Sequence, residues 1–158
     1  MDAELHPDLQ PLAFLLGTWQ GEGEGQYPTT QPFRFVEETR FWHLGDAYLL
    51  YRQSTTAHDD AAPIHTEMGF WRPQSGGRVD VSLAYPLGLS EIADGEVTGT
   101  TVHVVSRTIA VAGGASEVTR LERTIRVDGD TMEYELSMQT SEVPITRHVW
   151  GHLKRTGD

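Results

Sequence analysis

The sequence PITRHVWGHLKR, at residues 144–155, is the stretch that best indicates the fold of this chain. Because side chains alternate between the two faces of a β-strand, the stretch predicts a strand with two different faces. One face would carry Thr146, His148, Trp150 and His152, and the other would carry Arg147, Val149, Gly151 and Leu153. The chain is therefore predicted to end in a strand that presents His148 on an apolar-walled face.

The same alternation recurs upstream and predicts further strands. It is clearest where Val79, Val81 and Leu83 alternate with Asp80, Ser82 and Ala84. Together with a first strand from residue 17 to 25, strand-like runs cover residues 33–44, 47–56, 64–72, 78–85, 90–97, 101–112, 117–127, 131–140 and 146–155. Pairs of turn-forming residues such as Gly76-Gly77 separate these runs. The chain thus predicts about ten short strands joined by hairpin-length links.

This pattern predicts an all-β fold, a roughly ten-stranded antiparallel up-and-down β-barrel with a short N-terminal helix. Closure into a barrel is favoured because it removes the exposed edges of the sheet. A barrel of this size is wide enough to hold a ligand inside or at its mouth. No internal repeat or linker divides the 158 residues, so we expect a single domain over residues 1–158.

The N-terminal part of the chain departs from the strand pattern. Residues 8–17 begin with a capping Asp8, hold an apolar cluster and end at Gly17, which predicts a short helix. Trp19 is interpreted as a core plug at the base of the barrel, and residues 27–32, with two prolines, are predicted to form a loop. Glycine then occupies alternate positions at Gly21, Gly23 and Gly25. In a strand these glycines would let another backbone, or a flat ligand, approach closely.

Composition excludes several classes of function. The formal net charge of −11 disfavours nucleic acid and anionic membrane surfaces as partners. The absence of cysteine excludes disulfides, thiolate metal sites and thiol nucleophiles. No apolar run reaches the length of a membrane span, and the first four residues do not resemble a signal peptide. We therefore expect a cytoplasmic protein.

No common catalytic motif occurs in the sequence, and the candidate groups are isolated. Glu37 and Glu38 could form an acid and base pair, but adjacent strand residues face opposite ways, so one solvated and one hydrogen-bonded carboxylate is the favoured interpretation. His148 and His152 lie too far apart along a strand to share a metal ion. By itself, His148 could be an axial ligand of a haem iron, although a strand histidine is more often a packing or surface residue.

An ordered set of motifs resembles the nitrobindins, a family of haem-binding β-barrels related in shape to fatty-acid-binding proteins and lipocalins. The stretch LLGTWQGEG at residues 15–23 is similar to the Gly-x-Trp-x-Gly-x-Gly signature of the family. Further matches follow in the family's order: Tyr27-Pro28-Thr29, Pro32-Phe33, Glu37-Glu38, Phe41, His43, Gly45, Tyr51, Gln53, Pro63-Ile64-His65, Glu67, Gly69, YELSM at 134–138, Pro144 and His148. The resemblance covers nearly the whole chain.

The resemblance implies that the chain binds one haem b, with His148 as the proximal ligand to the iron. It also implies that Thr29 contacts the haem and that Ile64 and His65 line the pocket. Ile64 and Tyr85 stand where some relatives carry other residues, which alters the shape or polarity of the distal side. Since the sequence contains no obvious distal histidine, we expect an open and weakly polar sixth position, with the free ring nitrogen of His148 bonded to a carbonyl, carboxylate or water.

The implied activity is isomerisation of peroxynitrite to nitrate at ferric haem, together with binding of nitric oxide by ferrous haem. The family also suggests a homodimer. Two alternatives remain open at the level of sequence. The chain could be a haem-free carrier of a small hydrophobic ligand, for which inward-facing candidates are Phe33, Phe35, Leu83, Tyr85 and Leu136. It could also be a haem-based nitric oxide sensor or store with negligible turnover.

Overall fold

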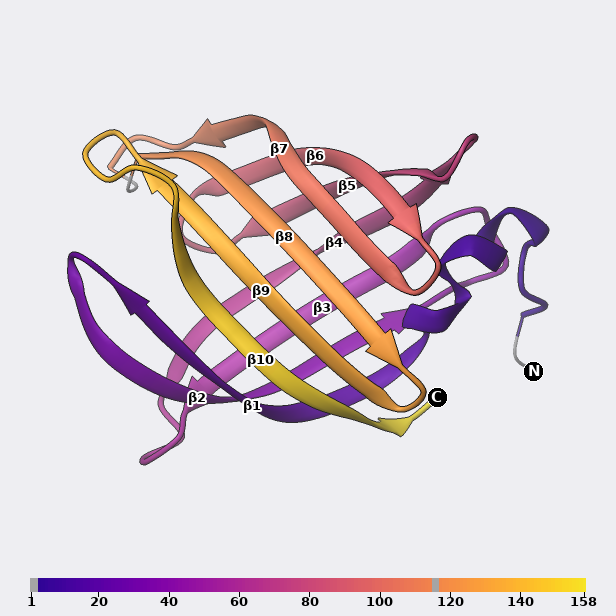
Figure 1. The fold of residues 1–158 in the computed structure, drawn as a ribbon, viewed down its shortest axis with the longest axis horizontal. Helices are drawn as coiled ribbons and strands as arrows, with labels where there is room; N and C mark the ends of the chain where they lie inside the picture. The colour runs from indigo at the N-terminus through magenta and orange to yellow at the C-terminus, as the bar shows by residue number, and fades with distance from the viewer. Residues whose placement is uncertain (1–2, 115–116) are drawn as a thin grey trace.

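Ten antiparallel strands close into a barrel in the computed structural model, which describes residues 3–114 and 117–158 (Figure 1). The strands are β1 (Gly17–Tyr27), β2 (Thr30–Trp42), β3 (Leu49–Ala57), β4 (Pro63–Gln74), β5 (Arg78–Tyr85), β6 (Leu89–Thr98), β7 (Thr101–Val111), β8 (Val118–Asp128), β9 (Thr131–Thr140) and β10 (Thr146–Gly157). A short helix, η1 (Pro7–Leu15), precedes them. The predicted all-β barrel with an N-terminal helix is confirmed, while residues 1–2, which begin the stretch inspected for a signal peptide, lie outside the described residues.

Each strand pairs with the next one along the chain, and β1 pairs with β10 to complete the circle. The predicted up-and-down order is therefore confirmed. Closure depends on the glycines of β1, because Gly21 lies opposite Leu153 and Gly23 lies opposite Gly151. A Cβ at Gly21 would collide with the backbone of β10 at His152. The sequence of β1 thus permits the close strand contact that joins the first and last strands.

The alternate glycines of β1 also receive aromatic side chains from β2. A Cβ at Gly23 would collide with the ring of Phe35, and one at Gly25 would collide with the ring of Phe33. The space beside these glycines was predicted to admit another backbone or a flat ligand. In the structure it is occupied by β10 and by two phenylalanines. These rings are held against β1 and line the interior at this end of the barrel.

The helix differs in type and boundaries from the prediction. η1 is a 3₁₀ helix whose N-cap is His6, which accepts a hydrogen bond from the backbone N–H of Asp8. The prediction of Asp8 as the cap is therefore wrong, since Asp8 lies in the first turn. Pro11 lies inside this short helix and has no N–H to donate to the carbonyl of a preceding turn.

The predicted loop at residues 27–32 is shorter in the structure. Only Pro28 and Thr29 form the turn, and β2 begins at Thr30. Pro32 therefore lies inside a strand. It is tolerated because the pairing of β2 with β3 starts only at Phe35, so on that side the missing N–H of Pro32 has no ladder bond to make.

One end of the barrel is closed by η1, which lies over it in Figure 1. Six fully buried side chains fill this closed end, namely Leu9, Leu12 and Leu15 of η1 with Trp19, Phe41 and Trp71 of the barrel. The indole N–H of Trp19 donates to the carbonyl of Leu15 at 2.9 Å, and the guanidinium of Arg155 lies 4.1 Å from the centre of the Trp19 ring. The interpretation of Trp19 as a core plug is confirmed.

Candidate ligand-binding site

A chamber of about 300 Å³ lies at the end of the barrel opposite η1. Its walls near the opening are mostly apolar and include Phe33, Phe35, Leu136 and Val149, with His148 among them. A larger and more open hollow lies outside the chamber and shares Phe33 and His148 with it. The chamber therefore opens to solvent at the rim where His148 lies.

A β-bulge in β10 directs His148 into the chamber. Arg147 pairs with Ser137 of β9 and Val149 pairs with Leu136, so His148 is the extra residue between two consecutive pairs. The imidazole and the next side chain, Val149, consequently both line the chamber.

Because of the bulge, the side chains that share a face of the final strand differ from those predicted. Beyond it, Gly151 and Leu153 are buried inside the barrel, while Trp150 and His152 lie on the outer side. His148 therefore does not share a face with Trp150 and His152, as strict alternation had predicted. Without the bulge, the same register would have turned the imidazole outward.

Contacts on three sides orient the imidazole of His148. Its Nδ1 lies 3.0 Å from the backbone carbonyl of Gln26, which can only accept a hydrogen bond, so Nδ1 carries the proton. The rings of Tyr27 and Phe33 lie edge-on to the imidazole, with centroids at 5.0 and 6.3 Å. Within residues 3–114 and 117–158, Nε2 has no hydrogen-bond partner. A neutral imidazole with a free Nε2, backed by an Nδ1–H to carbonyl bond, is the arrangement that a metal-ligating histidine requires.

The opposite wall of the chamber is more polar than the sequence indicated. In the strand order of the barrel, β4 is four places from β10 by way of β1, β2 and β3, which puts the two strands on nearly opposite sides. His65 and Ile64 of β4 and Tyr85 of β5 line this wall. The expectation of a weakly polar distal side is therefore wrong, because an imidazole and a phenol face the chamber across from His148.

Beneath the chamber lies a layer of buried and half-buried polar side chains that separates it from the closed end. We call it the polar layer; it comprises Glu37, Tyr51, Gln53, Glu67, Glu91, Arg123 and Tyr134. Its central ion pair joins Arg123 Nη2 to Glu67 Oε1 at 2.9 Å, with both side chains buried. The hydroxyl of Tyr51 donates to the same oxygen at 2.7 Å. Burial by itself raises the pKa of Glu67, but Arg123, assisted by His65 and Tyr51, lowers it to about 2.

The other two carboxyl groups of the polar layer have the opposite tendency. Burial raises the pKa of Glu37, and the hydrogen bonds from Tyr134, Thr39 and Gln53 offset this only in part. Burial likewise raises the pKa of Glu91, whose Oε1 accepts from the hydroxyl of Tyr85 at 2.8 Å. The layer thus combines one firmly ionised carboxylate with two that hold protons more readily than usual.

The interpretation of the Glu37-Glu38 pair is confirmed. Glu37 is buried and accepts hydrogen bonds from Thr39 and Gln53, both at 2.7 Å, whereas Glu38 is half-exposed and pairs with Arg52 at 2.7 Å. The two carboxyl groups therefore do not act as a catalytic pair.

Thr29 and Ile64 lie at the rim rather than deep in the site. Thr29 is exposed in the turn between β1 and β2, and it is absent from the described residues that line the chamber. Ile64 lines both the chamber and the outer hollow and is 40% exposed. Of the four residues expected to contact the cofactor, the structure brings His148, His65 and Ile64 together around one chamber.

Sequence reasoning did not find the polar layer. Glu67 and Arg123 are separated by more than fifty positions, so no local pattern pairs them. Alternation does place Glu67 and Arg123 on inward faces, and a charged residue at an inward position was the one signal that could have indicated a buried ion pair.

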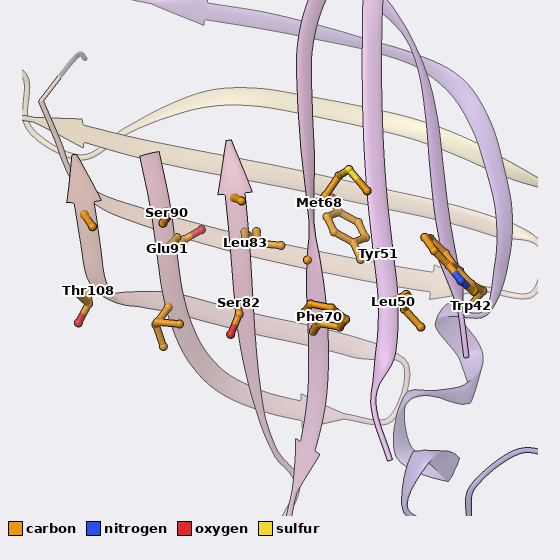
Figure 2. A pocket seen from close by; sticks show the side chains of 14 residues that line it. Trp42, Leu50, Tyr51, Met68, Phe70, Ser82, Leu83, Ser90, Glu91 and Thr108 are labelled. Carbon is orange, nitrogen blue, oxygen red and sulfur yellow. The ribbon is translucent and has the colours of Figure 1, made fainter. Parts of the chain in front are cut away.

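A separate hollow lies on the outer surface of the barrel, away from the chamber. It extends across β2 to β7 and is lined by exposed or half-exposed side chains including Trp42, Met68, Phe70 and Ile92 (Figure 2). Figure 2 shows Leu50, Phe70 and Ser82 following one another across neighbouring strands. Such an apolar outer face is suited to contact with another protein surface.

The described residues were compared with two further kinds of feature, clusters of metal-ligating side chains and membrane-spanning helices. Within the described part of the chain, no group of three or more histidine, aspartate or glutamate side chains is arranged to hold a metal ion. No helix among the described residues is long and apolar enough to cross a membrane.

Comparison with protein families identifies the class. The model of the "THAP4-like, heme-binding beta-barrel domain" matches residues 8–155. The chain therefore belongs to this family of haem-binding β-barrels, and the recognition made from the ordered motifs is confirmed. The residues around the chamber fit the cofactor, because His148 presents a free Nε2 beside the apolar side chains of the open rim.

Individual relatives are similar over almost their whole length. A protein named peroxynitrite isomerase 2 from Mycobacterium marinum is 42% identical, with 98% of this chain and 99% of the relative covered. A peroxynitrite isomerase from Nocardia farcinica is 43% identical, with coverage of 96% and 92%. The crystal structure of Rv2717c from M. tuberculosis superposes with a TM-score of 0.90 at 41% identity, covering 97% of this chain and 99% of that one.

Proposed function

We propose that this protein is a haem-dependent peroxynitrite isomerase in which His148 is the proximal ligand to the iron of haem b. The observation that carries the assignment is the bulge in β10, which turns His148 into an apolar chamber with Nε2 free and Nδ1 bonded to the Gln26 carbonyl. The names of relatives that are about 42% identical over the full chain support the reaction. One barrel domain, residues 1–158, would carry the whole function.

Bound haem would supply an iron with one open coordination position, at which peroxynitrite can rearrange to nitrate. The chain itself has four tasks in this scheme. His148 holds the iron through Nε2, and the Gln26 carbonyl keeps the imidazole in the required tautomer. Phe33, Phe35 and the neighbouring apolar side chains limit the access of water to the chamber. The rim, where Ile64 lies and near which the turn with Thr29 is found, would contact the exposed edge of the cofactor.

We propose further that the ferrous form binds nitric oxide at the same open position. The finer statements about partners and location are also proposals. The charge of −11 argues against nucleic acid and anionic membranes, and a chain without cysteine fits a reducing cytoplasm. The apolar outer face around Phe70 would suit a homodimer contact, which sedimentation of the haem-loaded protein would test.

The decisive experiment removes the proposed ligand and keeps a matched control on the same strand. His148→Leu should weaken haemin binding by more than about 100-fold, because losing only a partner behind a metal ligand already costs about 10- to 100-fold. It should also abolish the acceleration of peroxynitrite decay. The control is His152→Leu, since His152 lies four residues further along β10 on the outer face and pairs with Glu133. If His148→Leu retains the Soret band and the decay rate of the parent, the assignment is wrong.

The carrier of hydrophobic ligands is the weaker alternative. A fatty acid would need a partner for its carboxylate, and Arg123 is the guanidinium that lines the chamber among the described residues. Arg123 is already neutralised by Glu67 at 2.9 Å, so a second carboxylate would gain little there. Uptake of a fluorescent fatty acid without haemin binding would support the carrier. A haem-based sensor or store would instead bind haemin and nitric oxide without accelerating peroxynitrite decay.

A further inference from the structure

We propose that His65, positioned by the buried carboxylate of Glu67, is the group that hydrogen-bonds a small anion or its conjugate acid in the chamber, across from His148. The proposal rests on the function proposed above and assigns a recognition residue to it. Three features support the proposal: the place of His65 in the barrel, the fixed carboxylate behind it, and the ring nitrogen that remains free.

His65 is placed to reach a ligand that is bound opposite His148. It lies on β4, lines the chamber, and has a side chain that is 37% exposed, so it is open to the chamber and to entering molecules. Its ring packs against Tyr85 of β5 with centroids 5.6 Å apart, and its neighbour in register on β3 is Thr55. The ring therefore has a neighbour on each adjacent strand, and these neighbours limit the orientations that it can adopt.

Glu67 fixes one edge of the His65 ring. Oε2 of Glu67 lies 3.0 Å from Nε2 of His65, while Oε1 accepts from Arg123 at 2.9 Å and from Tyr51 at 2.7 Å. Glu67 is 1% exposed, so this carboxylate cannot turn towards water. A buried carboxylate whose two oxygens have separate, assigned partners is a rigid support for the imidazole.

The ionisation of Glu67 decides which nitrogen of His65 carries the proton. Because Arg123 outweighs the effect of burial and the pKa of Glu67 falls to about 2, the carboxylate is ionised at neutral pH and can only accept. Nε2 of His65 must then be the donor. Nδ1 has no hydrogen-bond partner within residues 3–114 and 117–158. Neutral His65 thus offers an acceptor at Nδ1, and protonated His65 offers a donor at the same atom while keeping its bond to Glu67.

This arrangement suits a ligand that exists both as a weak acid and as its anion. A protonated ligand would donate its hydrogen bond to Nδ1 and transfer that proton to the ring, leaving the anion beside an imidazolium N–H. No electron moves, and the proton lost by the acid is the proton gained by Nδ1. The charged groups that face this ring or its support are Glu67, Arg123 behind it, Glu91 behind Tyr85, and His148 across the chamber. Small oxidised nitrogen anions and their acids meet this requirement.

The test uses haem-loaded protein and measures binding rather than turnover. Azide is titrated into ferric protein between pH 5.5 and 8.5, for the parent chain, His65→Leu and the control His103→Leu. His103 is an exposed strand histidine bonded to Thr124 outside the chamber. At pH 5.5 the parent should bind azide about 10-fold or more tightly than His65→Leu, which is the size of a charge-assisted hydrogen bond. At pH 8.5 the two affinities should converge, because the anion is bound only through a proton on Nδ1.

A second readout isolates the positioning role of Glu67. The carbon monoxide stretching band of ferrous protein reports polar groups near the ligand, so it should be narrow in the parent and shift in His65→Leu. In the double variant Glu67→Gln/Arg123→Met, neither charge of the buried ion pair remains, and His65 loses its ionic support. We expect this variant to fold and to show a broadened or split carbonyl band, because the ring is no longer held in one orientation.

The outcomes separate the two proposals. If the parent chain does not bind haemin, or binds it equally well without His148, the proposed function itself is overturned. A normal Soret band with azide affinities and carbonyl bands that are the same in the parent and His65→Leu at every pH would overturn the role of His65 alone. An unchanged carbonyl band in the double variant would restrict Glu67 to a structural role.

Discussion

The two ends of this barrel are built from the same strands but differ in what fills them. At the closed end, the apolar side chains of helix η1 pack with Trp19 and Trp71 in one fully buried cluster. At the other end, Phe33, Leu136 and His148 surround a chamber of about 300 Å³. The polar layer around Glu67 and Arg123 lies between them. Dense apolar packing therefore lies at the closed end, and the space that a ligand could enter lies at the open one.

The difference follows from the side chains that each strand contributes at its two ends. Near η1, the inward positions of β3, β4 and β5 carry Leu49, Trp71 and Val81, which pack without leaving space. Towards the chamber, the same strands carry Thr55, His65 and Tyr85, which are either small or partly polar. Apolar contacts therefore decrease along each strand, and the interior opens where they end.

The largest effect is expected in the polar layer, from Arg123→Met. It leaves the buried carboxylate of Glu67 without its partner, which should lower the free energy of unfolding by about 3–5 kcal/mol. The double variant Glu67→Met/Arg123→Met should recover most of that loss, because neither charge remains. Urea denaturation of the parent and both variants is the measurement. Equal destabilisation by the single and double changes would show that the ion pair is not the cause.

A loss of similar size should follow from Trp19→Ala at the closed end, where we expect about 3–5 kcal/mol from the lost packing. Trp19→Phe should cost less, since it keeps a ring in the core and gives up mainly the hydrogen bond to Leu15. Haemin affinity, measured by titration well below the unfolding transition, should stay within about twofold in both variants. A large change in haemin affinity would contradict the division of roles between the two ends.

The polar layer should also make stability depend on pH in two opposite directions. The pKa of Glu67 is lowered to about 2 in the folded state, so its contribution is present above its ordinary pKa and is lost as the pH falls towards 2, by roughly 3 kcal/mol. The pKa values of Glu37 and Glu91 are raised, so each destabilises the fold as the pH rises above the ordinary value for glutamate.

Unfolding by urea between pH 3 and 8 checks both limbs of this profile. Stability should pass through a maximum on the acid side of neutrality. Glu37→Gln should flatten the decline on the alkaline side and leave the acid limb in place, because Glu67 is untouched. A profile of Glu37→Gln that is parallel to the parent above pH 5 would count against the raised pKa of Glu37.

A smaller effect is expected from Gly23→Ala, which tests how the chamber wall is packed. A Cβ at Gly23 would collide with the Phe35 ring and with the backbone carbonyl of Trp150, so the ring must move towards the chamber and β10 must shift, at a cost of about 1–3 kcal/mol. Haemin affinity should fall with stability, in contrast to Trp19→Ala. The control is Gly113→Ala, since no described atom lies within 4 Å of a Cβ placed there and its φ is not positive. Thermal unfolding and haemin titration of both variants provide the comparison.

The smallest effect is expected from Tyr27→Phe. The Tyr27 hydroxyl donates to the carbonyl of Met138 at 3.1 Å, which ties β1 to β9 beside the imidazole of His148. Removing one such bond should cost about 1 kcal/mol and weaken haemin binding by no more than about tenfold, while the ring contact with His148 remains. Tyr27→Leu removes that ring contact as well, so it should weaken haemin binding further. Identical haemin affinities in the two variants would argue that Tyr27 does not orient His148.

Most of the fold could be predicted because it depends on local rules. Alternation identified the strands, and the predicted bounds for residues 78–85 and 131–140 coincide with β5 and β9. Errors arose at single residues, as at Asp8, since His6 is the actual cap of the helix, and at Pro32, which is accepted in a strand because β3 does not pair with β2 at that position. Such details depend on partners that the local pattern does not contain.

The sequence by itself determined the up-and-down barrel and the plug at Trp19, and it indicated His148 as a candidate ligand, because hydrophobic alternation, turn residues and ordered motifs are all properties of short stretches. Only the tertiary structure decided where His148 points, since a bulge depends on the register between β10 and β9. It also decided that Glu67 meets Arg123 and supports His65, because an ion pair across the interior forms only when distant strands face one another in a closed barrel.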